Sequence, residues 1–185
     1  MKKSIRKIIN FFKSNEKEEI LKKIKETKEC NFQLLSKKLK NDKSFILEVI
    51  ENIEIKTKKI GNNLCILNDP YILKYVSQKL RTDEEVAFKA IKKYYGNFKY
   101  ISPELKENKR FILKIIQEID TKSYFNEMPE AYFLNYLSEE IRDDKEIVLA
   151  AVKKNSLNLE YASERVKNII GIMLASVKTD SSITI

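Results

Sequence analysis

The sequence contains no histidine, and this absence removes the commonest general base and the commonest metal ligand of proteins together. Glycine and proline are also scarce, with 3 of each in 185 residues. So few helix breakers, combined with abundant lysine, glutamate, leucine and isoleucine, favour an all-α fold over a sandwich or barrel. Because the sequence also lacks the common motifs for phosphate, nucleophilic serine, zinc and calcium chemistry, we expect a protein that is not an enzyme and has no cofactor or metal.

Cysteine is nearly absent too, since only Cys30 and Cys65 are present and neither belongs to a C-x-x-C pair. We expect both to be reduced core thiols in a cytoplasmic protein. No apolar run approaches the length that crosses a bilayer, and residues 1–13 mix basic and apolar residues unlike a signal peptide. A soluble protein is therefore expected. Its first segment packs on the domain or on a partner, or alternatively lies on an anionic membrane surface.

A serine marks a segment that occurs five times along the chain. The segments are FQLLSKKLKND, LKYVSQKLRTD, FKYISPELKEN, LNYLSEEIRDD and LEYASERVKN, with Ser36, Ser77, Ser102, Ser138 and Ser163 as the shared serines. These serines are 41, 25, 36 and 25 residues apart, and an apolar stretch of helical spacing follows each segment. The pattern predicts a unit of about 25 residues, made of a short helix, a polar corner and a longer helix.

Capping signals indicate where these helices begin and end. Residues 82–85 and 143–146 have the form of capping boxes that open the longer helix. Ser102 followed by Pro103 is typical of a helix start, and Gly96 suits a helix end. The longer serine spacings contain insertions: residues 54–67 alternate around a Gly-Asn-Asn turn and predict a small β-hairpin, and residues 120–130 predict a loop.

Such units bury little surface alone and stack on their neighbours, so we expect a short solenoid-like array of helix pairs. The predicted single domain covers residues 1–185. It consists of basic N-terminal helices or a cap (1–30), repeats (31–166), a C-terminal helix (167–178) and a tail (179–185).

One stretch resembles a known family of repeats. Residues 134–155, LNYLSEEIRDDKEIVLAAVKKN, and the following LEYASE at 159–164 resemble a bacterial and protist family of short tandem helical repeats. Its units have the form Y-A-S-x-x-L-R-x-D-x-E-V-V-L-x-A-V-K-x-N, and the resemblance covers about residues 73–166. The family is of unassigned function, so the resemblance implies a fold and supplies no active site.

Positive charge is concentrated in the first third of the chain. Residues 1–60 hold 17 Lys and Arg against 9 Asp and Glu, a net +8 of the total +9. The candidate binding surface consists of two clusters: Lys37, Lys38 and Lys40, and Lys56, Lys58 and Lys59. These lysines could contact a phosphate backbone, or, on the hairpin, protect an edge strand from aggregation.

Basic and aromatic residues alternate over residues 92–100, as they do in single-strand nucleic-acid binders. Helical spacing favours a core position for these aromatics instead. That interpretation includes Tyr100, which shares its repeat position with Tyr75, Tyr136 and Tyr161.

Paired carboxylates, Glu139–Glu140 and Asp143–Asp144, could hold a cation or serve as acid and base. Their place in the repeat corners favours helix capping and solvated charge.

Together these patterns favour a non-enzymatic module that binds a protein or a protein–nucleic acid complex. Size, positive charge and missing catalytic motifs would also suit a mobile-element inhibitor of a host nucleic-acid-processing enzyme. The alternatives are direct RNA or DNA binding through the N-terminal lysines and, less favoured, an enzyme that uses carboxylates.

Overall fold

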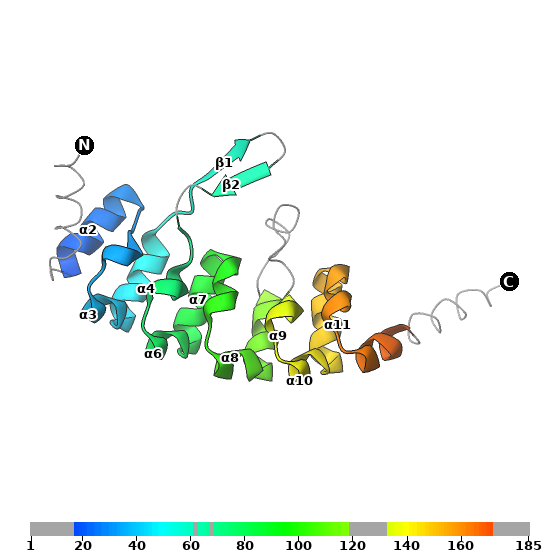
Figure 1. Ribbon diagram of the computed structural model, residues 1–185. Helices are drawn as coiled ribbons and strands as arrows, with labels where there is room; N and C mark the ends of the chain where they lie inside the picture. Colours follow the sequence, from blue (N-terminus) through cyan, green and yellow to red (C-terminus); the bar gives the residue numbers. More distant parts are fainter. Residues whose placement is uncertain (1–16, 61–62, 67–68, 119–132, 172–185) are drawn as a thin grey trace. The chain divides into compact units, whose positions relative to one another are not determined.

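The computed structural model describes residues 17–60, 63–66, 69–118 and 133–171. Helices are its main elements (Figure 1), which confirms the predicted all-α fold class. The chain divides into two compact units, Met1–Ser102 and Pro103–Ile185, called unit 1 and unit 2 below. The expectations for residues 1–13, 120–130 and 179–185 lie outside the described residues.

The described part of unit 1 starts with helix α2 (Lys17–Thr27) and continues with two repeats. The first contains the 3₁₀ helix η1 (Phe32–Leu34), α3 (Lys37–Lys40) and α4 (Lys43–Asn52). The second contains α5 (Ile72–Tyr75), α6 (Gln78–Arg81) and α7 (Glu84–Lys93), followed by the 3₁₀ helix η2 (Tyr95–Tyr100). Between them, strands β1 (Thr57–Ile60) and β2 (Asn63–Ile66) pair antiparallel, with Thr57 opposite Ile66.

Unit 2 contains the remaining described helices. They are α8 (Pro103–Glu107), α9 (Lys109–Glu118), η4 (Phe133–Tyr136), α10 (Glu139–Arg142), α11 (Lys145–Lys154) and η5 (Ser156–Tyr161). Residues 164–171 are helical as well. Within the described ranges, every helix is too short or too polar to span a lipid bilayer.

Repeated polar residues set the helix boundaries. The hydroxyl oxygens of Ser36 and Ser77 accept the N–H of the third residue onward, Leu39 at 3.3 Å and Leu80 at 3.4 Å. Asp83 accepts the N–H groups of Glu85 and Val86, both at 3.1 Å. Asp144 does the same for α11, accepting from Glu146 and Ile147 at 2.9 and 3.2 Å. These bonds satisfy donors that a first helical turn leaves free, and they confirm that residues 82–85 and 143–146 open the long helices.

The core lies on one face of each long helix. Buried residues recur at spacings of one, three and four: Phe45, Ile46, Val49 and Ile50 in α4, Val86, Ala87, Ala90 and Ile91 in α7, and Phe111, Ile112, Ile115 and Ile116 in α9. This spacing gives a single apolar stripe on each helix. Accordingly α4 packs on α7 within unit 1, and α9 packs on α11 within unit 2. The predicted solenoid would extend this side-by-side packing through the whole chain, and it stays a prediction.

At two of the junctions, a buried asparagine connects one repeat to the one before it. Asn97 is fully buried, and its Oδ1 accepts the N–H of Leu73 at 3.0 Å. Asn158 is fully buried in unit 2, and its Oδ1 accepts the N–H of Leu134 at 3.5 Å. Both bonds span 24 residues, which is close to the serine spacing of one repeat. Each asparagine therefore fixes how one repeat stacks on its predecessor.

Candidate binding site

The first predicted lysine cluster lies on α3, and its members differ in environment. Lys37 and Lys38 are exposed. Lys40 is half-buried, and its ammonium donates to the carbonyl oxygen of Gln33 at 3.0 Å. Arg81 occupies the same position of the next repeat and donates to the carbonyl of Lys74 at 3.2 Å. The basic residue at this position therefore bonds to a carbonyl oxygen of the preceding short helix. Lys37 and Lys38 remain as the candidates for ligand contact in this cluster.

The second predicted cluster lies at and beside β1. Lys56 is exposed and forms an ion pair with Glu29. Lys58 and Lys59 lie on β1 opposite Cys65 and Leu64, and their side chains are outside the described part of the structure. Figure 1 shows α3 well apart from the two strands. The backbone therefore places the two lysine clusters on separate elements of unit 1, and the shared surface stays a prediction.

Two of the corner carboxylates of unit 2, Asp143 and Asp144, are engaged in structural bonds, whereas Glu139 and Glu140 are exposed. Asp143 binds the guanidinium of Arg165 at 2.8 Å and accepts from the hydroxyl of Ser163. Arg165, and then Ser163, hold the pKa of Asp143 below its ordinary value. Asp144 caps α11 and pairs with Lys109 at 2.8 Å. Across the described ranges, no three His, Cys, Asp or Glu residues are grouped as a metal site would need.

The aromatic residues of 92–100 divide into two groups. Tyr94, Tyr95 and Phe98 are buried, as predicted for core residues. The core interpretation is wrong for Tyr100, which is half-buried, as are the three tyrosines that share its repeat position. Tyr75 illustrates the physical reason.

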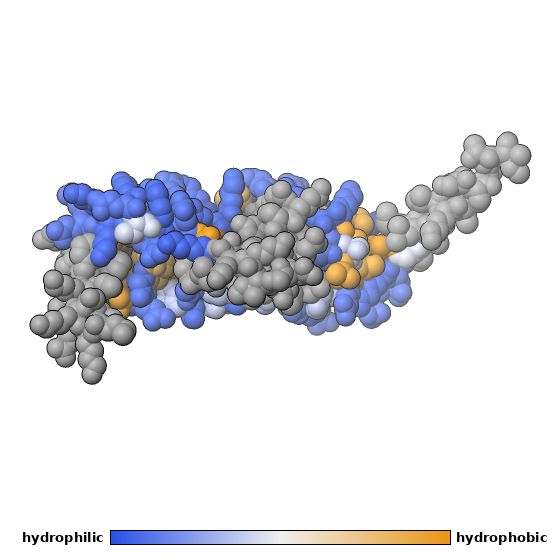
Figure 2. Space-filling model, turned by 90° about the horizontal axis from the view of Figure 1, so that it is seen from above, coloured by the Kyte–Doolittle hydropathy of each residue, from blue (hydrophilic) through white to orange (hydrophobic). Residues whose placement is uncertain are grey.

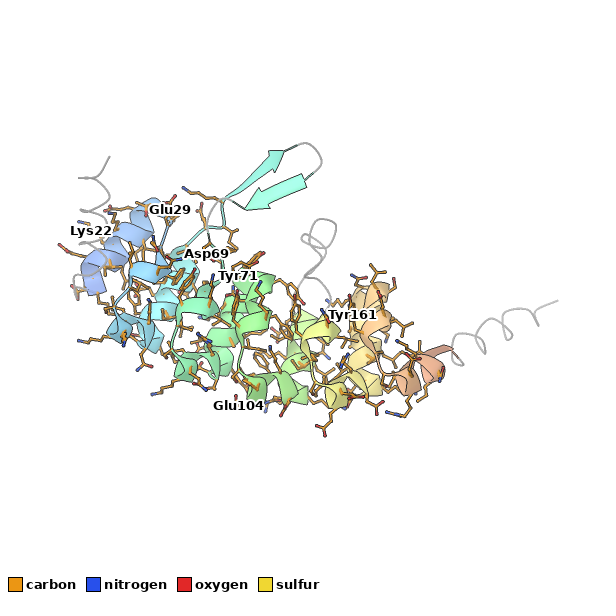
Figure 3. All side chains as sticks on the ribbon, in the orientation of Figure 1. Lys22, Glu29, Asp69, Tyr71, Glu104 and Tyr161 are labelled. Carbon is orange, nitrogen blue, oxygen red and sulfur yellow. The ribbon has the colours of Figure 1, made fainter. Side chains whose placement is uncertain are left out.

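Tyr75 packs at the junction between two repeats. Its ring lies 6.2 Å from that of Phe32, nearly parallel to it, and its hydroxyl accepts from Gln33 at 3.1 Å. The hydroxyl also donates to Asp69, which lies near Tyr71 in Figure 3. One ring face thus closes the junction while the hydroxyl reaches polar partners at the surface, so the residue cannot be wholly buried.

A lysine covers the neighbouring tyrosines. The ammonium of Lys99 lies 4.2 Å from the ring centre of Tyr71 and 5.2 Å from that of Tyr100. Tyr71 and Tyr100 also contact each other edge to face, with ring centres 5.5 Å apart. These rings already make cation–π and edge contacts within unit 1, which argues against a free platform for stacking bases.

A groove of about 520 Å³ runs between α9 and α11 in unit 2. Its apolar floor consists of Leu113, Ile116, Leu149 and Ala150, and its rim of Gln117, Glu146, Lys153 and Lys154. Ile116 belongs to the core, whereas Leu113 and Leu149 are half-exposed. Apolar surface at the bottom of a groove with a polar rim is typical of a site that binds another molecule.

The corresponding helices of unit 1 differ at two decisive positions. There Lys89 of α7 and Glu51 of α4 form an ion pair with 2.7 Å between Nζ and Oε1. Counted from the serine of each repeat, these positions hold Ala150 and Gln117 in unit 2. Neither side chain is charged, so the Glu51–Lys89 ion pair has no counterpart at these two positions of α9 and α11.

The two ends of the groove also differ. Beside the N-terminal end of α11, Lys109 pairs with Asp144 and Glu146, each at 2.8 Å. At the C-terminal end, Lys153 is exposed and Lys154 donates to the carbonyl oxygen of Gln117 at 3.3 Å. Figure 2, viewed from above, shows apolar surface over this part of unit 2. Leu157 of η5 is 53% exposed. Sequence patterns missed this groove because it depends on which residues differ between repeats.

The structure therefore defines an all-α protein of helix-pair repeats with a surface groove between two long helices. A family model for a domain of unknown function (DUF4116) matches residues 63–106, 83–126 and 108–167. The three overlapping matches span more than half of the chain, so the protein belongs to this family. Searches of curated proteins and of solved structures found no match.

Proposed function

We propose that the protein is a non-enzymatic binding module that recognises a protein partner through the groove between α9 and α11. The observation that carries the proposal is the apolar lining of this groove, in which Leu113, Leu149 and Ala150 are partly exposed above the buried Ile116. Apolar surface that stays in contact with water reduces solubility and favours association. A partner that covers this floor would remove it from water and gain binding free energy.

Comparison within the chain supports the proposal. The repeats share the residues that cap helices, such as Asp83 and Asp144. They differ at the groove, where unit 1 places the Glu51–Lys89 ion pair between its long helices. In unit 2 the same positions hold Gln117 and Ala150, which leave the apolar lining without a charged pair across it.

A comparative pull-down tests this function. Full-length wild type, Leu149→Glu and the matched control Leu47→Glu would be immobilised and exposed to extract from the source cells. Leu47 holds the same repeat position in α4, and both leucines are half-buried, so both variants should fold. We expect a partner that is retained by wild type and Leu47→Glu and lost from Leu149→Glu. Equal retention by all three proteins contradicts the proposal. A retained nucleic-acid-processing enzyme would support the inhibitor hypothesis.

Nucleic-acid binding is the second candidate, because Lys37 and Lys38 are exposed on consecutive positions of α3. Fluorescence-anisotropy titrations with single- and double-stranded RNA and DNA would compare wild type with Lys37→Gln/Lys38→Gln. Binding that persists at physiological salt and is lost in the variant supports this candidate. Binding that disappears at physiological salt, or is equal in both proteins, eliminates it.

A further inference from the structure

We infer that the groove between α9 and α11 binds an amphipathic helix of the partner, antiparallel to α11, with acidic residues in the first turn of that helix. This inference rests on the proposed function and specifies the occupant of the same site.

The shape of the groove favours a helix as its occupant. Its lining residues recur at helical spacing, with Leu113, Ile116 and Gln117 on α9 and Leu149, Ala150 and Lys153 on α11. The groove therefore follows the two helices, which at 10 residues each are about 15 Å long. An amphipathic helix fits such a groove by its apolar face.

An extended peptide would gain less in this groove. Added strands bind mainly through main-chain hydrogen bonds to an open sheet edge. The backbone groups in the middle of α9 and α11 are already bonded within their own helices. The walls of the groove therefore offer side chains, which match the apolar stripe of a helix.

The charges at the two ends determine the direction of the occupant. Lys109 offsets Asp144 and Glu146 beside the N-terminal end of α11. At the C-terminal end Lys153 and Lys154 supply two positive charges against the one negative charge of Glu118, and Lys153 is exposed without an ion pair to any described residue. Acidic residues of a partner are attracted to that end.

Helix dipoles favour the same direction. Acidic residues stabilise a helix when they lie in its first turn, and the N-terminus of a helix carries partial positive charge. Placed over the C-terminal ends of α9 and α11, this N-terminus meets partial charges of opposite sign. The lysines also complement the dipole of α11 itself, a role that Lys92 and Lys93 fill in the last turn of α7. Lys92 is therefore the matched control for Lys153, since both are exposed at the same repeat position.

The test uses a display library of helical peptides, each about 16 residues long so that it exceeds the length of the groove. Leucines are fixed on one face and all other positions are randomised. The library is selected on the full-length wild type and counter-selected on Leu149→Glu. We expect Asp and Glu to be enriched in the first turn. The selected peptides should bind Lys153→Gln about two- to fivefold more weakly than wild type, and Lys92→Gln as tightly as wild type.

Three results would overturn the inference: acidic residues enriched in the last turn, no charge preference, or equal weakening by Lys153→Gln and Lys92→Gln. Failure to obtain any peptide that depends on Leu149 would reject a helical occupant. The pull-down with Leu149→Glu decides the proposed function separately, because it does not depend on the conformation of the partner.

Discussion

Removing the Asn97 side chain is expected to destabilise unit 1 more than its small size suggests. Helix α5 begins at Ile72, and its N-cap residue, Tyr71, makes no capping bond through its side chain. Asn97 supplies that bond from 24 residues away, accepting the N–H of Leu73 at 3.0 Å. The Asn97→Ala variant therefore leaves a donor at the start of α5 without its acceptor in a buried place.

The magnitude follows from which partners keep another bond. The Asn97 amide donates to the carbonyl oxygens of Pro70, Ala90 and Tyr94 at 3.0–3.1 Å. Each of these carbonyls also accepts a backbone N–H, so none is left without a partner. The unsatisfied N–H of Leu73 costs about 1–3 kcal/mol. Adding the cavity left by the side chain gives a total loss of about 2–4 kcal/mol.

Urea unfolding followed by circular dichroism measures the loss, and hydrogen exchange with mass spectrometry locates it. Exchange should accelerate at α5 and remain unchanged in unit 2. The matched variant Asn158→Ala should lower the free energy of unfolding by about half as much, because the bond from the Leu134 N–H to Asn158 is long, at 3.5 Å. A loss below about 1 kcal/mol for Asn97→Ala, or unchanged exchange at α5, would refute the reasoning.

Two further predictions concern titratable groups. Burial raises the pKa of Asp83, but Lys43 and the N–H groups of Val86 and Glu85 outweigh this and hold the pKa below its ordinary value. This stabilisation is present above about pH 4 and is lost as the pH falls through the lower folded-state pKa. In urea unfolding, Asp83→Ala should therefore lower the free energy of unfolding by about 1 kcal/mol at pH 7 and by less at pH 3. Cys30 is half-buried rather than in the core as expected, and the burial of its thiol raises its pKa to about 12. Alkylation at pH 8, quantified on the Cys30 peptide, should be at least about a hundredfold slower in the folded than in the urea-unfolded protein, and equal rates would contradict this.

Sequence reasoning predicted the local elements well because their causes are local. Ser36 and Asp83 cap helices through residues two or three positions away, and such bonds leave a short-range pattern. The bond from Asn97 to Leu73 spans 24 residues, so no short-range pattern marks it. An asparagine does stand five residues before the repeat serine at Asn31, Asn97 and Asn158, but this spacing does not identify the residue to which it bonds.

The candidate site was less predictable, because a lysine can either bond within the protein or remain exposed for a ligand. Lys40 and Lys38 lie two residues apart, yet one closes a helix and the other is exposed. Only the position of the Gln33 carbonyl separates their roles, and that position is set by the packing of the repeat.

The difference between the α4–α7 and α9–α11 helix pairs allows a test in which residues of the first pair are introduced into the second. Gln117→Glu combined with Ala150→Lys would introduce into unit 2 the ion pair that Glu51 and Lys89 form in unit 1. An exposed pair of this kind changes stability by less than about 1 kcal/mol, so the fold should be retained. The new lysine would cross the apolar floor beside Leu149, and we expect the double variant to lose the partner that wild type retains in the pull-down. Gln117→Glu alone leaves the floor open and should retain the partner. If the double variant folds normally and binds as wild type does, the floor between α9 and α11 is not the binding site.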